Sequence, residues 1–372
     1  RAVGVAGQLL TASQKPDFVA GVKQEYRVIR ERHARDRAGG KRSTIAAARA
    51  NRKKIDWSCY LPPRPRVTGL KVLDRYPLAE LVERIDWTPF FQSWELQGRY
   101  PDILQDKVVG EAARNLFDDA QKMLKEIVAQ PERLFGRAVI GFWPANSAGD
   151  DIEVYADDRR NAPLAVIHSL RQQMARDNAR PNLALADFVA PAETGLHDWV
   201  GAFAVTSGSG LDELAAEYKA GNDDYNAILV KALADRLAEA LAERIHERVR
   251  KEFWAYAPDE ALANADLIGE KYRGIRPAPG YPACPDHTEK ATLFHLLDAE
   301  ANAGITLTES FAMLPGAAVS GWYFAHPEAE YFGVGRIEAD QVADYARRKG
   351  MDVRTMERWL GPNLNYDPVE RP

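Results

Sequence analysis

The feature that most constrains the fold of this chain is a long amphipathic segment between Asp223 and Phe253. Its apolar residues recur every four positions: Leu229, Leu233, Leu237, Leu241, Ile245 and Val249. This spacing places them along one face of a helix. Asp223 or Asp224 can cap its start, and Arg250 and Lys251 suit its negative C-terminal end. At ~1.5 Å per residue such a helix is about 45 Å long, so its apolar face must be buried against a sheet or another helix.

Short apolar runs before this helix predict strands, because each is bounded by Gly, Pro, Asp or Asn. They cover residues 138–142, 152–155, 164–167 and 199–205. Further helices are predicted at residues 111–128, 289–297, 339–348 and 352–360. The strands and helices do not alternate strictly, which does not favour a doubly wound parallel sheet.

The N-terminal part of the chain differs from the rest in its charge. Apolar spacing predicts helix over residues 1–30, and a basic stretch with Gly39-Gly40 follows. We interpret this stretch as a solvated linker rather than a nucleic-acid arm, because no aromatic residues interleave with the charges. The sequence starts at Arg1 without an initiator Met. We therefore expect the chain to be a piece of a larger protein.

Composition narrows the class of protein. The 372 residues are 46% hydrophobic, which is ample for a large core, and the net charge is −5, which argues against nucleic-acid binding by the whole chain. No apolar run approaches the ~18 residues of a membrane span. The two cysteines, Cys59 and Cys284, suit a reducing compartment. We therefore expect a cytoplasmic protein. The histidines lack metal-ligand spacing, so we expect no metal site.

The segment Gly274–His287 is the strongest candidate binding site. Four prolines and two glycines in fourteen residues exclude a regular helix or strand and predict a stiff, extended loop. Arg276 adds a planar cation and Tyr281 an aromatic face. Such a loop can hold a small polar ligand with little ordering cost. The alternative is a proline-rich connector between two elements.

Two aromatic segments are further candidates. In Ile85–Trp94, four aromatic residues surround Asp86, which either binds a ribose or ammonium group or caps a helix ahead of a core cluster. In residues 314–335, small residues and paired aromatics favour either stacking on a purine or sulfonium group or a packed β-hairpin. Val205–Gly210 follows a predicted strand and resembles part of a glycine-rich nucleotide loop, although a simple turn explains it as well.

Several of these segments together resemble the C-terminal activation domain of cobalamin-dependent methionine synthase. The resemblance is carried in order by residues 86–91, 142–146, 185–191, 276–287, 308–313 and 320–324. The string Arg-Pro-Ala-Pro-Gly-Tyr-Pro-Ala-Cys-Pro that begins at Arg276 is the most specific of them. The resemblance covers nearly everything from residue 43 onward, and the opening helix is similar to the end of that enzyme's cobalamin-binding module.

The resemblance implies a division of the chain and a fold. Residues 1–30 would be the C-terminal helix of the cobalamin-binding module, 31–42 a basic linker, and 43–372 the activation domain. We expect an α+β fold: one large domain with a twisted, mainly antiparallel sheet flanked by helices, including one very long helix.

The resemblance also implies a site for S-adenosylmethionine in a shallow groove. Its ligand-binding residues would be Asp86, Arg276, Ala278, Gly280, Tyr281, Tyr331 and Phe332. The family commonly has Tyr where this chain has Phe332, so a contact by that hydroxyl would be lost. Asp235 and Glu239 match acidic positions that face the cobalamin module, or they belong to a solvated stripe.

The implied activity is the reactivation of methionine synthase, the 5-methyltetrahydrofolate–homocysteine methyltransferase. In the family, inactive cob(II)alamin is reductively methylated by S-adenosylmethionine with an electron from flavodoxin or a flavoprotein reductase. The implied task is positioning, without a catalytic residue of the protein. Cobalamin would be bound by the neighbouring module, so this chain alone is not expected to catalyse methionine synthesis.

Two other functions fit parts of the sequence. A glycine-loop methyltransferase using Gly208 and Gly210 predicts a parallel sheet with the ligand at that turn. A non-enzymatic module that senses the ligand or binds RNA through the basic arm predicts salt-dependent RNA binding.

Overall fold

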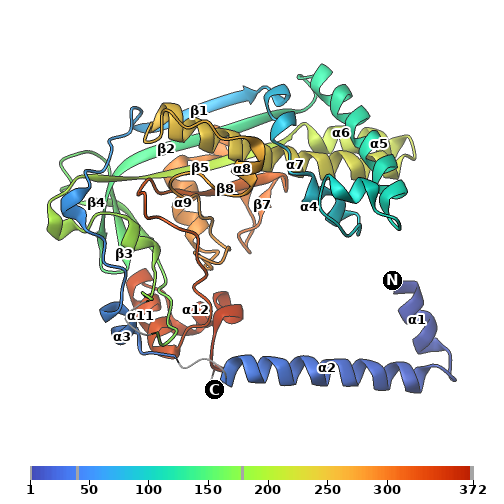
Figure 1. Ribbon diagram of the computed structural model, residues 1–372, viewed down its shortest axis with the longest axis horizontal. Coiled ribbons are helices and arrows are strands. Elements are labelled where there is room, and N and C mark those ends of the chain that lie inside the picture. The colour runs from blue at the N-terminus through green and yellow to red at the C-terminus, as the bar shows by residue number, and fades with distance from the viewer. Residues whose placement is uncertain (1, 39–41, 177–179, 369–372) are drawn as a thin grey trace.

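A six-stranded sheet is the centre of the computed structural model, which describes residues 2–38, 42–176 and 180–368 (Figure 1). The strands of this sheet are β1 (Gly69–Tyr76), β2 (Phe135–Ala148), β3 (Asp151–Tyr155), β4 (Pro163–His168), β5 (Asp198–Ser209) and β8 (Ala318–Tyr323). They lie in the order β4-β3-β2-β5-β8, and β1 also pairs with β2. Every one of these pairs is antiparallel. The predicted α+β class and antiparallel sheet are therefore confirmed.

Helices cover both faces of the sheet and both of its ends. They are α3 (Ile45–Ala50), α4 (Trp87–Ser93), α5 (Gly110–Ala129), α6 (Leu211–Ala220), α7 (Asp224–Arg248), α8 (Asn264–Ile268), α9 (Glu289–Leu297), α10 (Ala299–Ala303), α11 (Ala339–Lys349) and α12 (Val353–Trp359). Figure 1 shows α4, α5 and α6 at one end of the sheet and α3, α11 and α12 at the other.

Both faces of the central strands are buried. Alternate residues of β2 point to opposite sides, so Ile140 joins the core beneath α7 while Val139 joins the core beneath α9. The same alternation separates Phe203 and Ala202 on β5. A sheet covered on both faces explains why these strands are continuous apolar runs rather than alternating ones.

The long helix forms as predicted, with one difference at its end. The Asp223 side chain caps α7 by accepting a hydrogen bond from the Asn226 backbone N–H at 3.0 Å. Residues Val249–Phe253 continue the helix as a π-helical turn, in which the Trp254 N–H donates to the Val249 carbonyl. The wider turn accompanies the complete burial of Arg250 and near-complete burial of Trp254.

The N-terminal region forms two helices that stand apart from the sheet, α1 (Ala2–Leu10) and α2 (Lys15–Ala38) (Figure 1). Helix α2 continues past residue 30 into the predicted linker at 31–42, because residues 31–38 contain strong helix formers and no Gly. Gly39-Gly40 lies outside the described residues. The division at residues 30 and 42 stays a prediction.

Two alternatives from the sequence are wrong. The predicted hairpin within residues 314–335 does not form, because β7 (Met313–Leu314) pairs with β6 (Thr306–Leu307) while β8 pairs with β5. The glycine-loop methyltransferase required a parallel sheet, and β5 lies between antiparallel neighbours. Gly210 has φ +86° and its Cα packs against the Arg133 carbonyl, so this glycine serves a tight turn.

Candidate functional site

A cavity of about 530 Å³ lies where the sequence predicted the binding site. We call it the Arg276 groove. The proline-rich loop, residues 274–287, forms one wall, while α7, β5, β8 and residues 331–332 form the others. Its lining includes five of the predicted ligand-binding residues: Arg276, Ala278, Tyr281, Tyr331 and Phe332. Most of the other lining side chains are apolar, and such a volume is typical of small-molecule sites.

Backbone hydrogen bonds attach the proline-rich loop to the edge of the sheet. Ile275 and Phe324 exchange two hydrogen bonds of 3.0 Å, and the Trp322 N–H donates to the Pro277 carbonyl at 2.9 Å. Gly321 of β8 permits this approach, because a Cβ there would lie 2.7 Å from the Pro277 oxygen. The loop is therefore stiff through its prolines and also fixed at its start.

Gly280 forms the turn at the far end of the groove wall. Its φ is +97°, its N–H donates to the Cys284 carbonyl at 2.7 Å, and the Tyr281 N–H donates to the Ala278 carbonyl at 3.1 Å. A Cβ at this position would collide with the imidazole of His287. Gly280 does not line the cavity itself, but its turn sets the positions of Ala278 and Tyr281, which do.

Arg276 is held through both its main chain and its side chain. Its N–H donates to the Tyr331 hydroxyl at 3.0 Å, and that oxygen also lies 3.0 Å from the Tyr272 hydroxyl. Its Nη2 donates to Glu243 Oε2 at 2.7 Å. Burial opposes the positive charge, but the Glu243 carboxylate together with Tyr272, Tyr331 and Glu239 outweighs it, so the pKa of Arg276 is raised. The Arg276 side chain is 19% exposed, and the contact with Glu243 is the only hydrogen bond that its guanidinium makes among the described residues, so other N–H donors stay available to a ligand. Its Nε is buried and has no partner among those residues.

Asp86 lies in a smaller hollow next to the groove, which we call the Asp86 hollow. It has a volume of about 260 Å³, and Glu239, Glu270 and Arg276 line both cavities. Asp86 also caps α4, because its Oδ1 accepts the Thr88 N–H at 3.0 Å. Both interpretations of Asp86 are thus compatible with one position.

The two acidic residues predicted on the long helix, Asp235 and Glu239, differ in their exposure. Asp235 is exposed, whereas Glu239 is half-buried and lines both cavities. Among the described residues, neither Glu239 nor Glu270 makes a hydrogen bond or an ion pair that would compete with a ligand. The sequence did not single out Glu243, Glu270 or Tyr272, because they lie outside any motif and reach Arg276 only through the fold.

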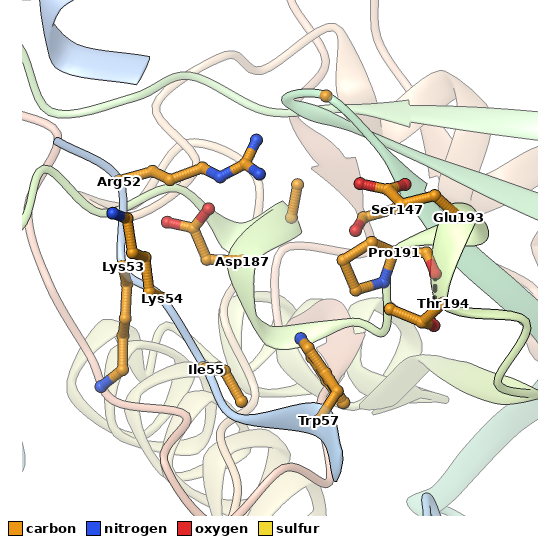
Figure 2. Close-up of a pocket in the computed structure, with 12 residues that line it drawn as sticks. Arg52, Lys53, Lys54, Ile55, Trp57, Ser147, Asp187, Pro191, Glu193 and Thr194 are labelled. Atoms are coloured by element: carbon orange, nitrogen blue, oxygen red, sulfur yellow. Dashed lines mark hydrogen bonds between the residues drawn. The ribbon is translucent and has the colours of Figure 1, made fainter. Parts of the chain in front are cut away.

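A second pocket, of about 270 Å³, lies on another part of the surface (Figure 2). We call it the Arg52–Lys54 pocket, and it contains none of the predicted ligand-binding residues. Its buried polar side chains already have partners: Asp187 accepts two hydrogen bonds from Arg171, and Ser147 donates to the Val189 carbonyl. Lys53 forms ion pairs with two glutamates, while Arg52 and Lys54 are exposed.

Two other features are absent from residues 2–38, 42–176 and 180–368, a metal site and a membrane span. No group of three or more His, Cys, Asp or Glu residues there is arranged to hold a metal ion. Among the same residues, no helix is both long enough and apolar enough to cross a bilayer.

Comparison with known proteins shows the family of this chain. The family model described as the activation domain of vitamin B12 dependent methionine synthase matches residues 77–350. This chain belongs to that family. A crystal structure of the MetH reactivation domain bound to AdoHcy is 55% identical in sequence, with a TM-score of 0.84, over 88% of this chain and 99% of that chain.

The family match includes most of the residues that form the groove. The matched residues 77–350 include Asp86, the whole proline-rich loop and the Tyr331-Phe332 pair. Domains of this family are part of an enzyme, vitamin B12-dependent methionine synthase. The other modules of that enzyme are therefore the expected neighbours of this domain. The predicted resemblance is confirmed, and so is the predicted fold.

Proposed function

We propose that the Arg276 groove binds S-adenosylmethionine and presents its methyl group to cobalamin held by another module of methionine synthase. The observation that supports this most is the groove itself, in which a partly exposed guanidinium, fixed by Glu243 and with other donors free, lies beside an apolar cavity. The related reactivation domain that was crystallised with AdoHcy binds the demethylated form of the same ligand.

The chemistry of the lining residues suits each part of this ligand. Arg276 offers donors to the methionyl carboxylate, and the carboxylates of Asp86, Glu239 and Glu270 suit the ammonium and the sulfonium. The rings of Tyr281, Tyr331 and Phe332 offer faces to the adenine and the sulfonium methyl. We propose these contacts, together with the main chain at Ala278 and Gly280, as the ligand-binding set.

We propose that this chain contributes positioning rather than an acid, a base or a nucleophile. The electron would reduce the cobalamin of the neighbouring module, the methyl group of S-adenosylmethionine would pass to the reduced cobalamin, and the sulfonium would leave as the neutral thioether S-adenosylhomocysteine. The walls of the groove exclude water from part of the ligand and fix the direction of its sulfur–methyl bond. Positioning of this kind can supply a large share of a rate enhancement.

The partners in this proposal are a cobalamin-binding module of the same enzyme and an electron donor of the flavodoxin or flavoprotein reductase type. Asp235 and Glu239 lie on the exposed and half-buried side of α7, where we propose that they face the cobalamin module. Exposed basic residues such as Arg52 and Lys54 can attract an acidic donor.

Calorimetric titration of the purified chain tests the binding step. We expect saturable binding of S-adenosylmethionine and of S-adenosylhomocysteine at one site, and competition between them. Reductive methylation is then followed by absorbance after addition of a cobalamin-binding module and a reduced flavoprotein, with S-adenosylmethionine omitted as the control. Failure of either ligand to bind would contradict the proposed function, whatever the outcome of the second assay.

A further inference from the structure

The acidic stripe of α7 continues into the protein interior beyond the predicted pair. Asp235, Glu239, Glu243 and Glu247 follow one another at intervals of four residues. Asp235 is exposed, whereas Glu243 is only 8% exposed. A carboxylate is rarely buried unless cations compensate its charge. Glu243 therefore needs an explanation that a solvated helix face does not provide.

Glu243 lies between two arginines. Its Oε2 accepts from Arg276 Nη2 at 2.7 Å, and its Oε1 is 3.8 Å from Arg250 Nη1. Arg250 is fully buried in the π-helical turn, and its Nε and Nη2 donate to the Glu260 carboxylate at 2.7–3.0 Å. Two guanidinium groups and two carboxylates thus alternate in the order Arg276, Glu243, Arg250 and Glu260, and their charges sum to zero.

The same arginines are joined a second time through two tyrosines. The Arg250 guanidinium lies over the ring of Tyr272, 4.4 Å from its centroid. The Tyr272 hydroxyl contacts the Tyr331 hydroxyl, which accepts from the Arg276 backbone N–H. The contacts therefore close a ring of five residues: Arg276, Glu243, Arg250, Tyr272 and Tyr331. Only Arg276 and Tyr331 of this ring line the Arg276 groove.

We propose that Glu243, supported by Arg250, is a positioning residue for ligand binding that acts through Arg276. A guanidinium is planar, so fixing one Nη by Glu243 sets the directions of its other donors. Glu243 does not line the Arg276 groove, although it borders the Asp86 hollow from its inner side. Without this carboxylate, Arg276 would face Arg250 with no anion between them. The proposal rests on the proposed function, because it assumes that Arg276 contacts S-adenosylmethionine.

The test is a set of calorimetric titrations with S-adenosylmethionine and S-adenosylhomocysteine on Glu243→Gln, which keeps the side-chain volume. We expect a loss of affinity of about 10-fold to 100-fold. The loss should be equal for both ligands, because Glu243 acts through Arg276 rather than on the sulfonium charge. In an Arg276→Ala background, Glu243→Gln should cause less than about 2-fold further loss, since the residue through which it acts is gone.

A matched control comes from the next turn of the same helix. Glu247→Gln removes the same charge from an ion-paired side chain, which binds Arg84 and Arg244. We expect its affinity to stay within about 2-fold of the wild type even if its melting temperature falls. Tyr272→Phe provides a variant that keeps the packing if Glu243→Gln does not fold, and it should lower affinity by about 3-fold through the loss of one hydrogen bond.

The outcomes separate the two proposals. If the wild type binds neither ligand, the proposed function fails. If the wild type binds and Glu243→Gln binds equally well, the positioning role is wrong. A loss confined to S-adenosylmethionine would mean that Glu243 acts on the sulfonium directly, which also overturns it. The positioning role is also wrong if Glu247→Gln loses as much affinity as Glu243→Gln does. It is wrong as well if Glu243→Gln lowers affinity in the Arg276→Ala background as much as it does in the wild type.

Discussion

The Arg276 groove and the Arg52–Lys54 pocket both contain cationic side chains, but these side chains are held differently in the two cavities. In the groove, Glu243 fixes one side of the Arg276 guanidinium, which is partly exposed and makes no other hydrogen bond among the described residues. In the pocket (Figure 2), Lys53 is already ion-paired, and Arg52 and Lys54 are exposed. A fixed cation costs little further entropy when a ligand binds, whereas a mobile exposed cation must be ordered first.

The surroundings of the cations differ as well. Apolar side chains form most of the groove wall, so a charged contact made there is only weakly screened by water. The buried polar groups of the pocket, such as Asp187 and Ser147, have protein partners and offer nothing unsatisfied to a ligand. The two cavities therefore differ in whether a cation is fixed with donors free, not in how many cations they contain, and this difference is why we place the ligand in the Arg276 groove.

Removal of Arg276 should have the largest effect on the groove. Arg276→Ala loses charge-assisted hydrogen bonds to the ligand, so we expect affinity for S-adenosylmethionine to fall at least about 100-fold. It also leaves Glu243 buried without its main partner, and the melting temperature should fall. Calorimetric titration measures the first effect and thermal unfolding the second. Affinity equal to that of the wild type would remove Arg276 from the site.

Gly280→Ala should have the next largest effect. The substitution combines a strained positive φ with a collision against His287, so the turn must move and carry Ala278 and Tyr281 with it. We expect about a 10-fold loss of affinity, since two contacts of the ligand are displaced. Gly350→Ala is the control, because Gly350 also has a positive φ but has open space around its Cα. It should lower stability without changing affinity.

The interior beneath the groove should make stability depend on pH. Burial, with help from Arg250 and Arg276, lowers the pKa of His246 well below its usual 6.5. The unfolded chain therefore takes up a proton below pH ~6.5 that the folded protein does not, so stability falls as the pH falls through that value. Between pH 6.5 and 5.5 the wild type should lose about 1 kcal/mol more than His246→Asn in denaturant titrations. Parallel curves for the two proteins would contradict this.

Tyr331→Phe should have a smaller effect on binding. It removes the hydroxyl that accepts the Arg276 N–H, while the ring remains available to the ligand. We expect a loss of affinity of about 3-fold to 5-fold, as for one neutral hydrogen bond. A loss as large as that of Arg276→Ala would show that the hydroxyl contacts the ligand itself rather than the loop.

The double substitution Arg52→Ala with Lys54→Ala should have the smallest effect of all. Both side chains are exposed and lie outside the Arg276 groove, so we expect S-adenosylmethionine affinity within about 2-fold of the wild type. If these residues attract the electron donor, the rate of reductive methylation at low salt should fall instead. Weakened binding of S-adenosylmethionine would contradict our proposal that the ligand binds in the Arg276 groove and not in the Arg52–Lys54 pocket.

Local patterns predicted the elements of this fold well. The four-residue repeat located α7, and α9 has the predicted bounds, Glu289–Leu297. Glycine and proline located the loop that forms the groove wall, because their backbone preferences act within a few residues. The π-helical turn after Arg248 was not predicted, because it has no distinct sequence signal. The extension of α2 to Ala38 was not predicted either, because a basic run that ends at Gly39-Gly40 is also typical of a linker.

The partners of the site residues were not predictable in the same way. Glu243 follows the acidic spacing of Asp235 and Glu239, so its pattern indicates a solvated face, yet the fold buries it against Arg276. Tyr272 and Tyr331 are far apart in sequence, and the fold brings their hydroxyl groups within 3.0 Å of each other. Contacts of this kind depend on tertiary packing, which a single sequence does not encode in any local spacing.

A crystal structure of this chain with S-adenosylmethionine would test the central claim most directly. We expect the ligand in the Arg276 groove, with its carboxylate within hydrogen-bond distance of the Arg276 guanidinium and Glu243 still bound to that side chain. A ligand bound in the Arg52–Lys54 pocket, or one in the groove without contact to Arg276, would contradict the account.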